Sequence, residues 1–388
     1  MTALAAPPVT TTTTTPISLV TTPVPPVSPV PMMPLSSVEL DLHDEPVALP
    51  QARGPLTAAL LTALVRDPHR SLDLRHLSWE GEPADALLDE DLQLALWLTY
   101  ELHYRGLAGV DERWEWHPEL LWARGRWEDH LMAGLELAVA RPEALDAAGV
   151  VAELTALAES DGGPSLSKFL MRDATGEQFG EFLVHRSLYH LKEADPHSWA
   201  IPRLSGRVKG ALVTIQADEY GGGDTSAMHA QLFRAVLADR GLATAYGAHL
   251  ERVPAVTLLA TNVISLLGLH RRWRGALVGH LAAFEMSSST PNARYARGFR
   301  RLGGSESAAR FFDEHVVADA VHEQIALHDL AAGQARVEPA TAPDVVFGAR
   351  VAAHLDRLFA EHVLGAWEAG VSSLRPALSP VQDAEVVA

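Results

Sequence analysis

The segment from Phe311 to Leu327 repeats apolar residues every three or four positions and contains neither glycine nor proline, a pattern that predicts an α-helix. His315, Asp319 and His322 occupy positions i, i+4 and i+7 of this helix. At about 100° per residue, their side chains fall on one narrow stripe of the helix surface. Two imidazoles and one carboxylate on a single stripe form half of a site for a first-row transition metal. An ordinary solvated helix face could carry the same residues.

The same helical spacing of apolar residues runs through most of the chain. The predicted helices are Pro55 to Val65, Asp89 to Tyr104, Pro118 to Val139, Ala147 to Ala158, Phe179 to Glu193, Arg207 to Tyr220, Ser226 to Arg240, Ala255 to Phe284, Ala308 to Ala332 and Pro343 to Gly370. No segment alternates apolar and polar residues as a half-buried strand does, and no internal repeat is present. The sequence therefore predicts an all-α bundle of about seven core helices, with a helical extension and the first core helices in residues 55–160 and the main core in residues 161–375.

The two ends of the chain differ from this helical part. Residues 1–50 are rich in threonine and proline, and such a segment buries too little apolar surface to offset the entropy of ordering. We therefore expect it to be disordered, and we expect residues 376–388 to fray. The N-terminus lacks the basic and apolar regions of a secretory signal, and no apolar run approaches the roughly 18 residues of a membrane span. These features predict a cytoplasmic protein.

Composition narrows the possible partners and the type of metal site. The 388 residues include no cysteine, which excludes disulfides, thiolate metal sites and cysteine nucleophiles. Any metal must therefore be bound through nitrogen and oxygen. The formal net charge of −18 argues against a general affinity for nucleic acid or anionic membranes.

Four further residues extend the candidate metal site. Glu193, Glu219, His229 and Glu285 lie on or beside other predicted helices, and Glu285 stands in an apolar run. A buried carboxylate must be paired, protonated or bound to a metal. Together with the first stripe, these residues supply three imidazoles and four carboxylates, a set that suits two iron or manganese ions sharing carboxylates in a helical bundle. Each residue, taken alone, could equally be a satisfied core or surface polar group.

The order of the motifs points to a family. No glutamate is followed three residues later by histidine, which argues against the Glu-x-x-His motifs of ferritin-like di-iron proteins. The sequence instead resembles the haem-oxygenase-like di-metal oxidases and oxygenases, which are iron-containing redox enzymes. The resemblance rests on Leu188-Tyr-His-Leu-Lys-Glu-Ala-Asp-Pro-His197, Ile201-Pro-Arg-Leu-Ser-Gly206, Gln216-Ala-Asp-Glu-Tyr-Gly-Gly-Gly223, Met228-His229 and the His-x3-Asp-x2-His of the first helix. It is greatest to the N-oxygenating members, such as the N-oxygenase domain of streptozotocin biosynthesis and the amino-imidazole oxygenase of the azomycin pathway.

This resemblance implies a haem-oxygenase-like fold and a set of metal-binding and catalytic residues. The implied set is Glu193, Glu219, His229, Glu285, His315, Asp319 and His322. It further implies two iron ions that alternate between Fe(II) and Fe(III), dioxygen as co-substrate and an external electron donor. The implied reaction is N-oxygenation of a small nitrogen-containing substrate, an amine or amino-heterocycle of specialised metabolism. From the tryptophan and leucine content of the helical extension we also expect a homodimer.

Three other interpretations stay open. A related oxidase could use the same residues for desaturation or carbon–carbon cleavage of an amino acid or fatty acid. A non-catalytic helical binding module would bind no iron and would not respond to dioxygen. Haem oxygenase itself would bind porphyrin, which the carboxylates around the histidines disfavour. Asp218, Tyr220 and Arg203 are candidates for supporting roles, although a purely structural role is the simpler interpretation of each.

Overall fold

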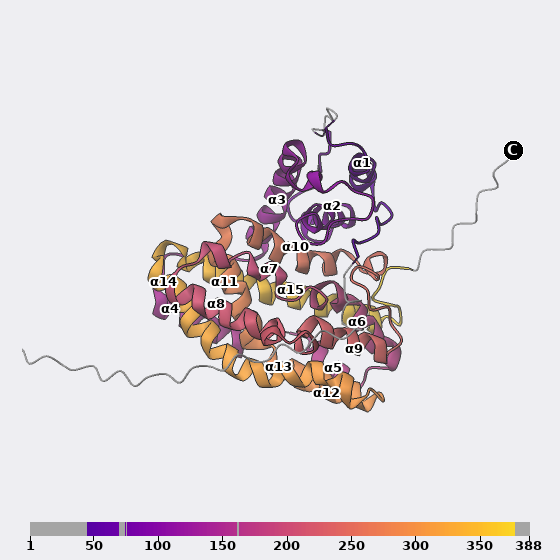
Figure 1. Ribbon diagram of the computed structural model, residues 1–388. Coiled ribbons are helices and arrows are strands. Elements are labelled where there is room, and N and C mark those ends of the chain that lie inside the picture. Colours follow the sequence, from indigo (N-terminus) through magenta and orange to yellow (C-terminus); the bar gives the residue numbers. More distant parts are fainter. Residues whose placement is uncertain (1–44, 70–73, 75, 161–162, 377–388) are drawn as a thin grey trace, which may run out of the picture. The chain divides into compact units, whose positions relative to one another are not determined.

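The computed structural model describes residues 45–376, apart from 70–73, 75 and 161–162. These residues form helices joined by short loops (Figure 1), and their one β pairing is an isolated bridge between Val47 and Leu107. The α-helices are α1 (Pro55–Leu64), α2 (Glu90–Glu101), α3 (Pro118–Ala138), α4 (Ala147–Glu159), α5 (Leu166–Arg172), α6 (Gly176–His190), α7 (Asp195–Ser198), α8 (Gly206–Glu219), α9 (His229–Asp239), α10 (Ala255–Leu269), α11 (Arg274–Ser287), α12 (Ser289–Arg301), α13 (Glu306–Gln324), α14 (Ala332–Val337) and α15 (Ala342–Glu368). The all-α prediction is confirmed. Most of the segment expected to be disordered, residues 1–44, and the tail 377–388 lie outside the described residues.

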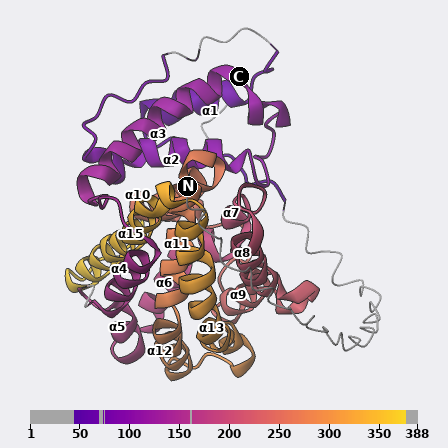
Figure 2. The same ribbon diagram turned by 90° about the vertical axis from the view of Figure 1, so that its left-hand side faces the viewer.

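Helices α1, α2 and α3 pack together around buried tryptophans. Trp97 and Trp127 are at most 1% exposed, and Trp127 Nε1 donates a hydrogen bond to the Leu77 carbonyl at 3.0 Å. Asn262 of α10 donates from Nδ2 to the side chain and the backbone carbonyl of Gln93 on α2, both at 2.8 Å. This buried amide contact joins the three helices to α10, beside which they lie in both ribbon views (Figures 1 and 2).

Helix α10 is the interior helix of the described bundle. All its residues except Ala260 and Leu269 are buried, as expected for a helix that is apolar on every side. It contacts α2, α6, α7, α11 and α15. The neighbouring helices α11 and α15 approach backbone to backbone, because a Cβ added at Gly279 would overlap the Val345 carbonyl. This close crossing fixes the position of α11.

An aromatic cluster holds α6, α9, α12 and α13 together. Phe179, Phe233, Phe299, Phe311 and Phe312 are each at most 1% exposed, and their neighbouring ring centroids lie between 5.0 and 6.4 Å apart. Helix α13 also contacts α11, and Figure 2 shows α13 beside both α11 and α12. The packing of these rings thus positions the helix that carries the His-x3-Asp-x2-His motif.

Three predicted helices end or divide where the periodicity does not show it. The segment predicted as one helix from Ala255 to Phe284 is two helices separated at His270, where the backbone is extended. His270 Nε2 lies 2.8 Å from Oε2 of the buried Glu128, a tertiary contact that apolar spacing alone does not reveal. Helix α6 ends at His190, before Glu193. After α13 the chain continues as a π-helix, Ile325–Ala331, before α14 begins.

Candidate metal centre

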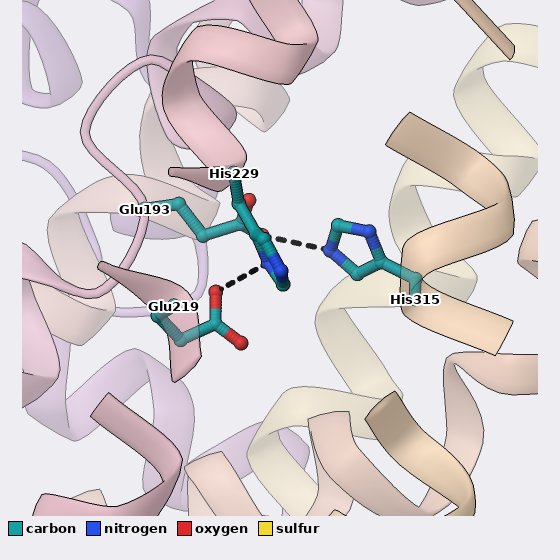
Figure 3. A group of neighbouring side chains, drawn as sticks. All are labelled: Glu193, Glu219, His229 and His315. Atoms are coloured by element: carbon teal, nitrogen blue, oxygen red, sulfur yellow. Dashed lines mark ion pairs between the residues drawn. The ribbon is translucent and has the colours of Figure 1, made fainter. Parts of the chain in front are cut away.

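Two overlapping groups of carboxylates and imidazoles lie inside the bundle. In each group, one potential ligand atom per residue lies within 4.8 Å of all the others. The first group is Glu193, Glu219, His229 and His315, and the second is Glu219, Glu285 and His322. Figure 3 shows the side chains of the first group turned toward one another. Glu219 belongs to both groups, so the two candidate sites share one carboxylate.

Most of these residues lie at or near the end of a helix, and His315 and His322 lie within α13. Glu219 is the last residue of α8 and His229 the first of α9, so His229 is at the helix start and not one turn inside a longer helix. Glu285 is near the end of α11. Glu193 lies in the turn after α6, where Ala194 has φ of 73°, a left-handed value that is uncommon for a residue other than glycine. Gln216 Nε2 donates to the Ala194 carbonyl at 2.7 Å and so supports this turn.

A glycine loop brings Glu219 and His229 together. Gly221, Gly222 and Gly223 have φ values of 67°, 62° and 94°, which glycine adopts without steric penalty and other residues do not. A Cβ at Gly221 would also lie only 2.7 Å from the backbone nitrogen of Met228. The triple glycine therefore allows the chain to turn back tightly between two candidate ligands.

The two histidines of α13 are oriented by hydrogen bonds on the side away from the cluster. His315 Nδ1 lies 2.8 Å from the Phe311 carbonyl, so Nδ1 donates and Nε2 is left facing the cluster. His322 Nε2 lies 2.9 Å from Asp218 Oδ2, which leaves Nδ1 facing Glu285 Oε2 at 3.3 Å. Metal-binding histidines usually donate their second N–H to a carboxylate or carbonyl in this manner.

His190 orients a carboxylate in the same way and was not among the predicted site residues. Its Nδ1 lies 2.9 Å from Glu193 Oε1, so this hydrogen bond leaves Oε2 of Glu193 without a partner. The His190 ring packs against Phe233 and Phe311, at centroid distances of 4.8 and 5.0 Å. The only sequence signal for this role is the i, i+3 spacing of His190 and Glu193.

Several buried ligand atoms have no hydrogen bond, which tests whether the residues fit a metal. These atoms are Glu193 Oε2, Glu219 Oε2, His229 Nδ1 and His322 Nδ1. Glu219 Oε2 and His229 Nδ1 lie 2.8 Å apart as an ion pair but not in hydrogen-bond geometry. Buried polar atoms are nearly always satisfied; other described atoms without a partner are scattered through the protein, but these four lie together among the candidate ligands. Carboxylate oxygens and imidazole nitrogens are donors suited to iron, so the residues present fit a metal centre.

The buried carboxylates of the cluster raise the pKa values of the two α13 histidines. Burial alone would lower the pKa of His315, but the carboxylate of Glu193, 3.7 Å from Nε2, and the charge of Glu219 raise it to about 10. Burial likewise acts to lower the pKa of His322, and Glu285 and Asp218 raise it to about 9. Burial and the charge of Glu219 raise the pKa of Glu285, although His322 opposes them. Metal ions binding here would therefore have to displace protons.

A cavity of about 710 Å³ reaches this centre. Its walls include Glu193, Glu219 and His315 as well as the aromatic side chains of Tyr189 and Phe284. Phe284 packs edge-on against Tyr189 at a centroid distance of 5.6 Å. The cavity is within the range of about 300–1,000 Å³ typical of small-molecule sites. A small substrate can therefore lie against the centre.

Residues 180–357 match the family model described as iron-containing redox enzyme. This segment contains all seven predicted site residues and most of the helices that position them. Comparison with curated proteins gives no significant match. The match to the iron-containing redox enzymes, together with the all-helical structure, confirms the expected haem-oxygenase-like fold and supports an oxidoreductase.

The carboxylate oxygens and imidazole nitrogens of the cluster are donors suited to iron, the metal named in the description of the matched family. The structure brings together six of the seven predicted residues, while the side chain of Asp319 lies outside the described residues. The alternative in which Glu285 pairs with an arginine is not observed, because its ion pair is with His322. Asp218 contacts His322, whereas Arg203 donates to the carbonyls of Gly268 and Leu269, a structural role.

Within the described part of the chain, no helix combines the length and the apolarity needed to cross a membrane.

Proposed function

We propose that this protein is a dioxygen-dependent oxidoreductase that holds two iron ions and N-oxygenates a small nitrogen-containing substrate. The observation that carries the proposal is the position of Glu219 between two groups of ligand atoms, since a shared carboxylate is how helical bundles hold paired iron ions. One ion would be held by Glu193, Glu219, His229 and His315, and the other by Glu219, Glu285 and His322. We assign Asp319 to the second ion from its position in the sequence motif.

When bound, the two ions would supply the electrons that activate dioxygen, and an external electron donor would restore them to Fe(II). The chain's own residues prepare the site for this chemistry. His190 and Asp218 fix the orientations of Glu193 and His322 through hydrogen bonds. Phe284 and Tyr189 line the cavity together with the ligands, and their rings give it an apolar wall.

Two observations support N-oxygenation over other oxidations at the same site. The motifs around the ligands resemble those of N-oxygenating enzymes, and His229 supplies the third imidazole of that pattern. The structure places His229 Nδ1 against Glu219 Oε2 at 2.8 Å, within the first group of ligand atoms. The proposed partners are a small nitrogen-containing substrate and an electron donor.

The first experiment is an anaerobic titration of the metal-free protein with Fe(II). We expect two equivalents to bind per chain, because six described ligand residues exceed what one ion with open positions for dioxygen would use. The His229→Ala variant should keep the fold and bind less iron. Saturation of the wild-type protein at one equivalent would exclude the two-ion site.

The second experiment follows the oxygen atom. Turnover of amine substrates under ¹⁸O₂ with a chemical reductant should leave ¹⁸O on nitrogen, as detected by mass spectrometry. The Glu219→Ala variant is the control, since it removes the shared carboxylate. An oxidised product without label on nitrogen would identify desaturation or carbon–carbon cleavage instead.

A further inference from the structure

The cavity at the metal centre carries opposite charges at its two ends. The inner end is formed by the buried carboxylates of the centre, and Glu323 of α13 is a further acidic lining residue. The opening is marked by exposed lining residues, among them Lys168, Thr290 and Arg357. In a chain with a net charge of −18, four cations line this cavity: Lys168, Arg186, Arg294 and Arg357.

These four cations differ in whether a carboxylate lies close enough to form an ion pair with them. Arg186 pairs with Asp356 at 3.2 Å, and Arg357 lies 3.7 Å from Glu361. Arg294 of α12 makes a single hydrogen bond, from Nη1 to the neutral Ser167 Oγ at 3.1 Å. No described carboxylate lies within ion-pair distance of it. Arg294 is half-buried, so a charge that no described carboxylate balances is held partly away from solvent. Lys168, a second cation of the cavity wall, follows Ser167 in the sequence.

The chemistry of Arg294 selects an anion. A guanidinium has five N–H donors, and the contact with Ser167 leaves most of them unused. Its planar fork matches a carboxylate, which it binds through two parallel hydrogen bonds. The cavity wall that Arg294 shares with the centre also includes the aromatic side chains of Phe182, Tyr189 and Phe284. The wall therefore suits a hydrocarbon segment between two polar ends.

We propose that the substrate is an amino acid whose carboxylate binds Arg294 while its reacting nitrogen lies at the metal centre. This inference rests on the proposed function for the identity of the reacting end, but not for the binding of the carboxylate. Arg294 thus determines specificity and the direction in which the substrate lies in the cavity. An amine without a carboxylate would lack the contact at the opening.

The test compares amino acids with the amines formed by their decarboxylation. The probes are L-lysine with cadaverine, L-arginine with agmatine, L-histidine with histamine and L-tryptophan with tryptamine. Dissociation constants are measured by calorimetry on the full-length chain, both metal-free and loaded anaerobically with Fe(II). At least one amino acid should bind about tenfold or more tightly than its amine, as expected when a charge-assisted bidentate contact is lost.

Three variants separate this role from a structural one. Arg294→Gln should remove the preference for the amino acid over its amine. Arg297→Gln makes the same change of charge one turn further along α12 at an exposed side chain, and should leave the preference intact. Ser167→Ala removes the hydrogen-bond partner of Arg294 and should also preserve it. If Arg294→Gln does not fold, Arg294→Lys keeps the charge without the fork and should reduce the preference.

The outcomes also separate this inference from the proposed function. A chain that binds amino acids selectively through Arg294 but fails to take up two iron ions contradicts the proposed function alone. Binding of the amines as tightly as the amino acids would overturn the carboxylate site, and so would an unchanged preference in Arg294→Gln. The carboxylate site would also be overturned if none of the four amino acids binds the wild-type chain.

Discussion

At the residue scale, the hydrogen bonds around the ligands decide which atoms face the centre. His190 occupies Oε1 of Glu193, and Asp218 occupies Nε2 of His322. Both contacts leave the opposite atom of the ligand unsatisfied. Partners of this kind typically change metal affinity by about 10- to 100-fold when they are removed.

His190→Ala should therefore weaken binding of iron by about tenfold or more, because Glu193 loses the hydrogen-bond partner that fixes the orientation of its carboxylate. His190→Gln, which retains an N–H donor, should recover part of that loss. The measurement is an anaerobic Fe(II) titration, with the far-ultraviolet circular dichroism spectrum confirming that both variants are folded. Equal iron affinity in His190→Ala and the wild type would contradict the positioning role.

Glu285→Gln tests the carboxylate whose pKa is raised by burial and by Glu219. The substitution keeps the volume and removes the charge, so the metal-free protein should melt at about the same temperature or slightly higher. Iron affinity or turnover should fall by about tenfold or more. Glu314→Gln on α13, at a side chain that is 43% exposed, is the matched control. A strongly destabilised metal-free protein with intact iron binding would remove Glu285 from the site.

At the element scale, the crossing of α11 and α15 sets where Glu285 lies. Backbone contact at Gly279 and Gly348 leaves no space for a side chain, since a Cβ at Gly348 would overlap the Ala276 carbonyl. Forcing extra atoms into a packed interior generally costs about 1–3 kcal/mol and sometimes more. The position of the metal ligand is thus coupled to the spacing of two long helices.

Gly348→Ala should lower the free energy of unfolding by about 1–3 kcal/mol or more, as measured by urea denaturation. Gly365 lies on the same helix with nothing within 4 Å of an added Cβ. Gly365→Ala should therefore raise the free energy of unfolding by roughly 0.5–1 kcal/mol through helix propensity. Similar effects of the two substitutions would show that close packing at Gly348 does not decide the result.

The elements were predictable from the sequence to different degrees. Apolar spacing located most of the longer helices, since burial of one helix face leaves a regular pattern, but it did not predict α5, α7 or α12. It missed the break at His270, which depends on the distant Glu128, and the end of α6 before Glu193. In the site, residue type and spacing revealed the candidate ligands, but the roles of His190 and Asp218 are visible only where the helices meet.

At the scale of the whole molecule, the centre links metal content, pH and stability. The pKa of His315 is raised from its ordinary value of about 6.5 to about 10, and that of His322 to about 9. A group whose pKa is raised by folding stabilises the protein below its unfolded pKa and loses this contribution as the pH rises through the folded value. The contribution is therefore present in full below about pH 6.5 and lost toward pH 10.

The melting temperature of the metal-free protein, kept in chelator, should fall as the pH is raised from 7 to 10. Bound metal supplies the positive charge in place of these protons, so the loaded protein should show a smaller fall. Metal-free His315→Gln should have a flatter profile than the wild type, because it lacks an imidazole whose pKa is raised to about 10. A melting temperature independent of pH in the metal-free wild type would contradict the assignment of protonated imidazoles.

Ser288 is the only residue between α11 and α12, and its backbone dihedrals remain helical. Glu285 and Arg294 are nine positions apart along this nearly continuous path, so at about 1.5 Å per residue their Cα atoms are separated by at most about 14 Å. The α11–α12 path therefore limits the distance between the centre and Arg294. A molecule of amino-acid length fits this distance, whereas an extended long-chain fatty acid is too long for it.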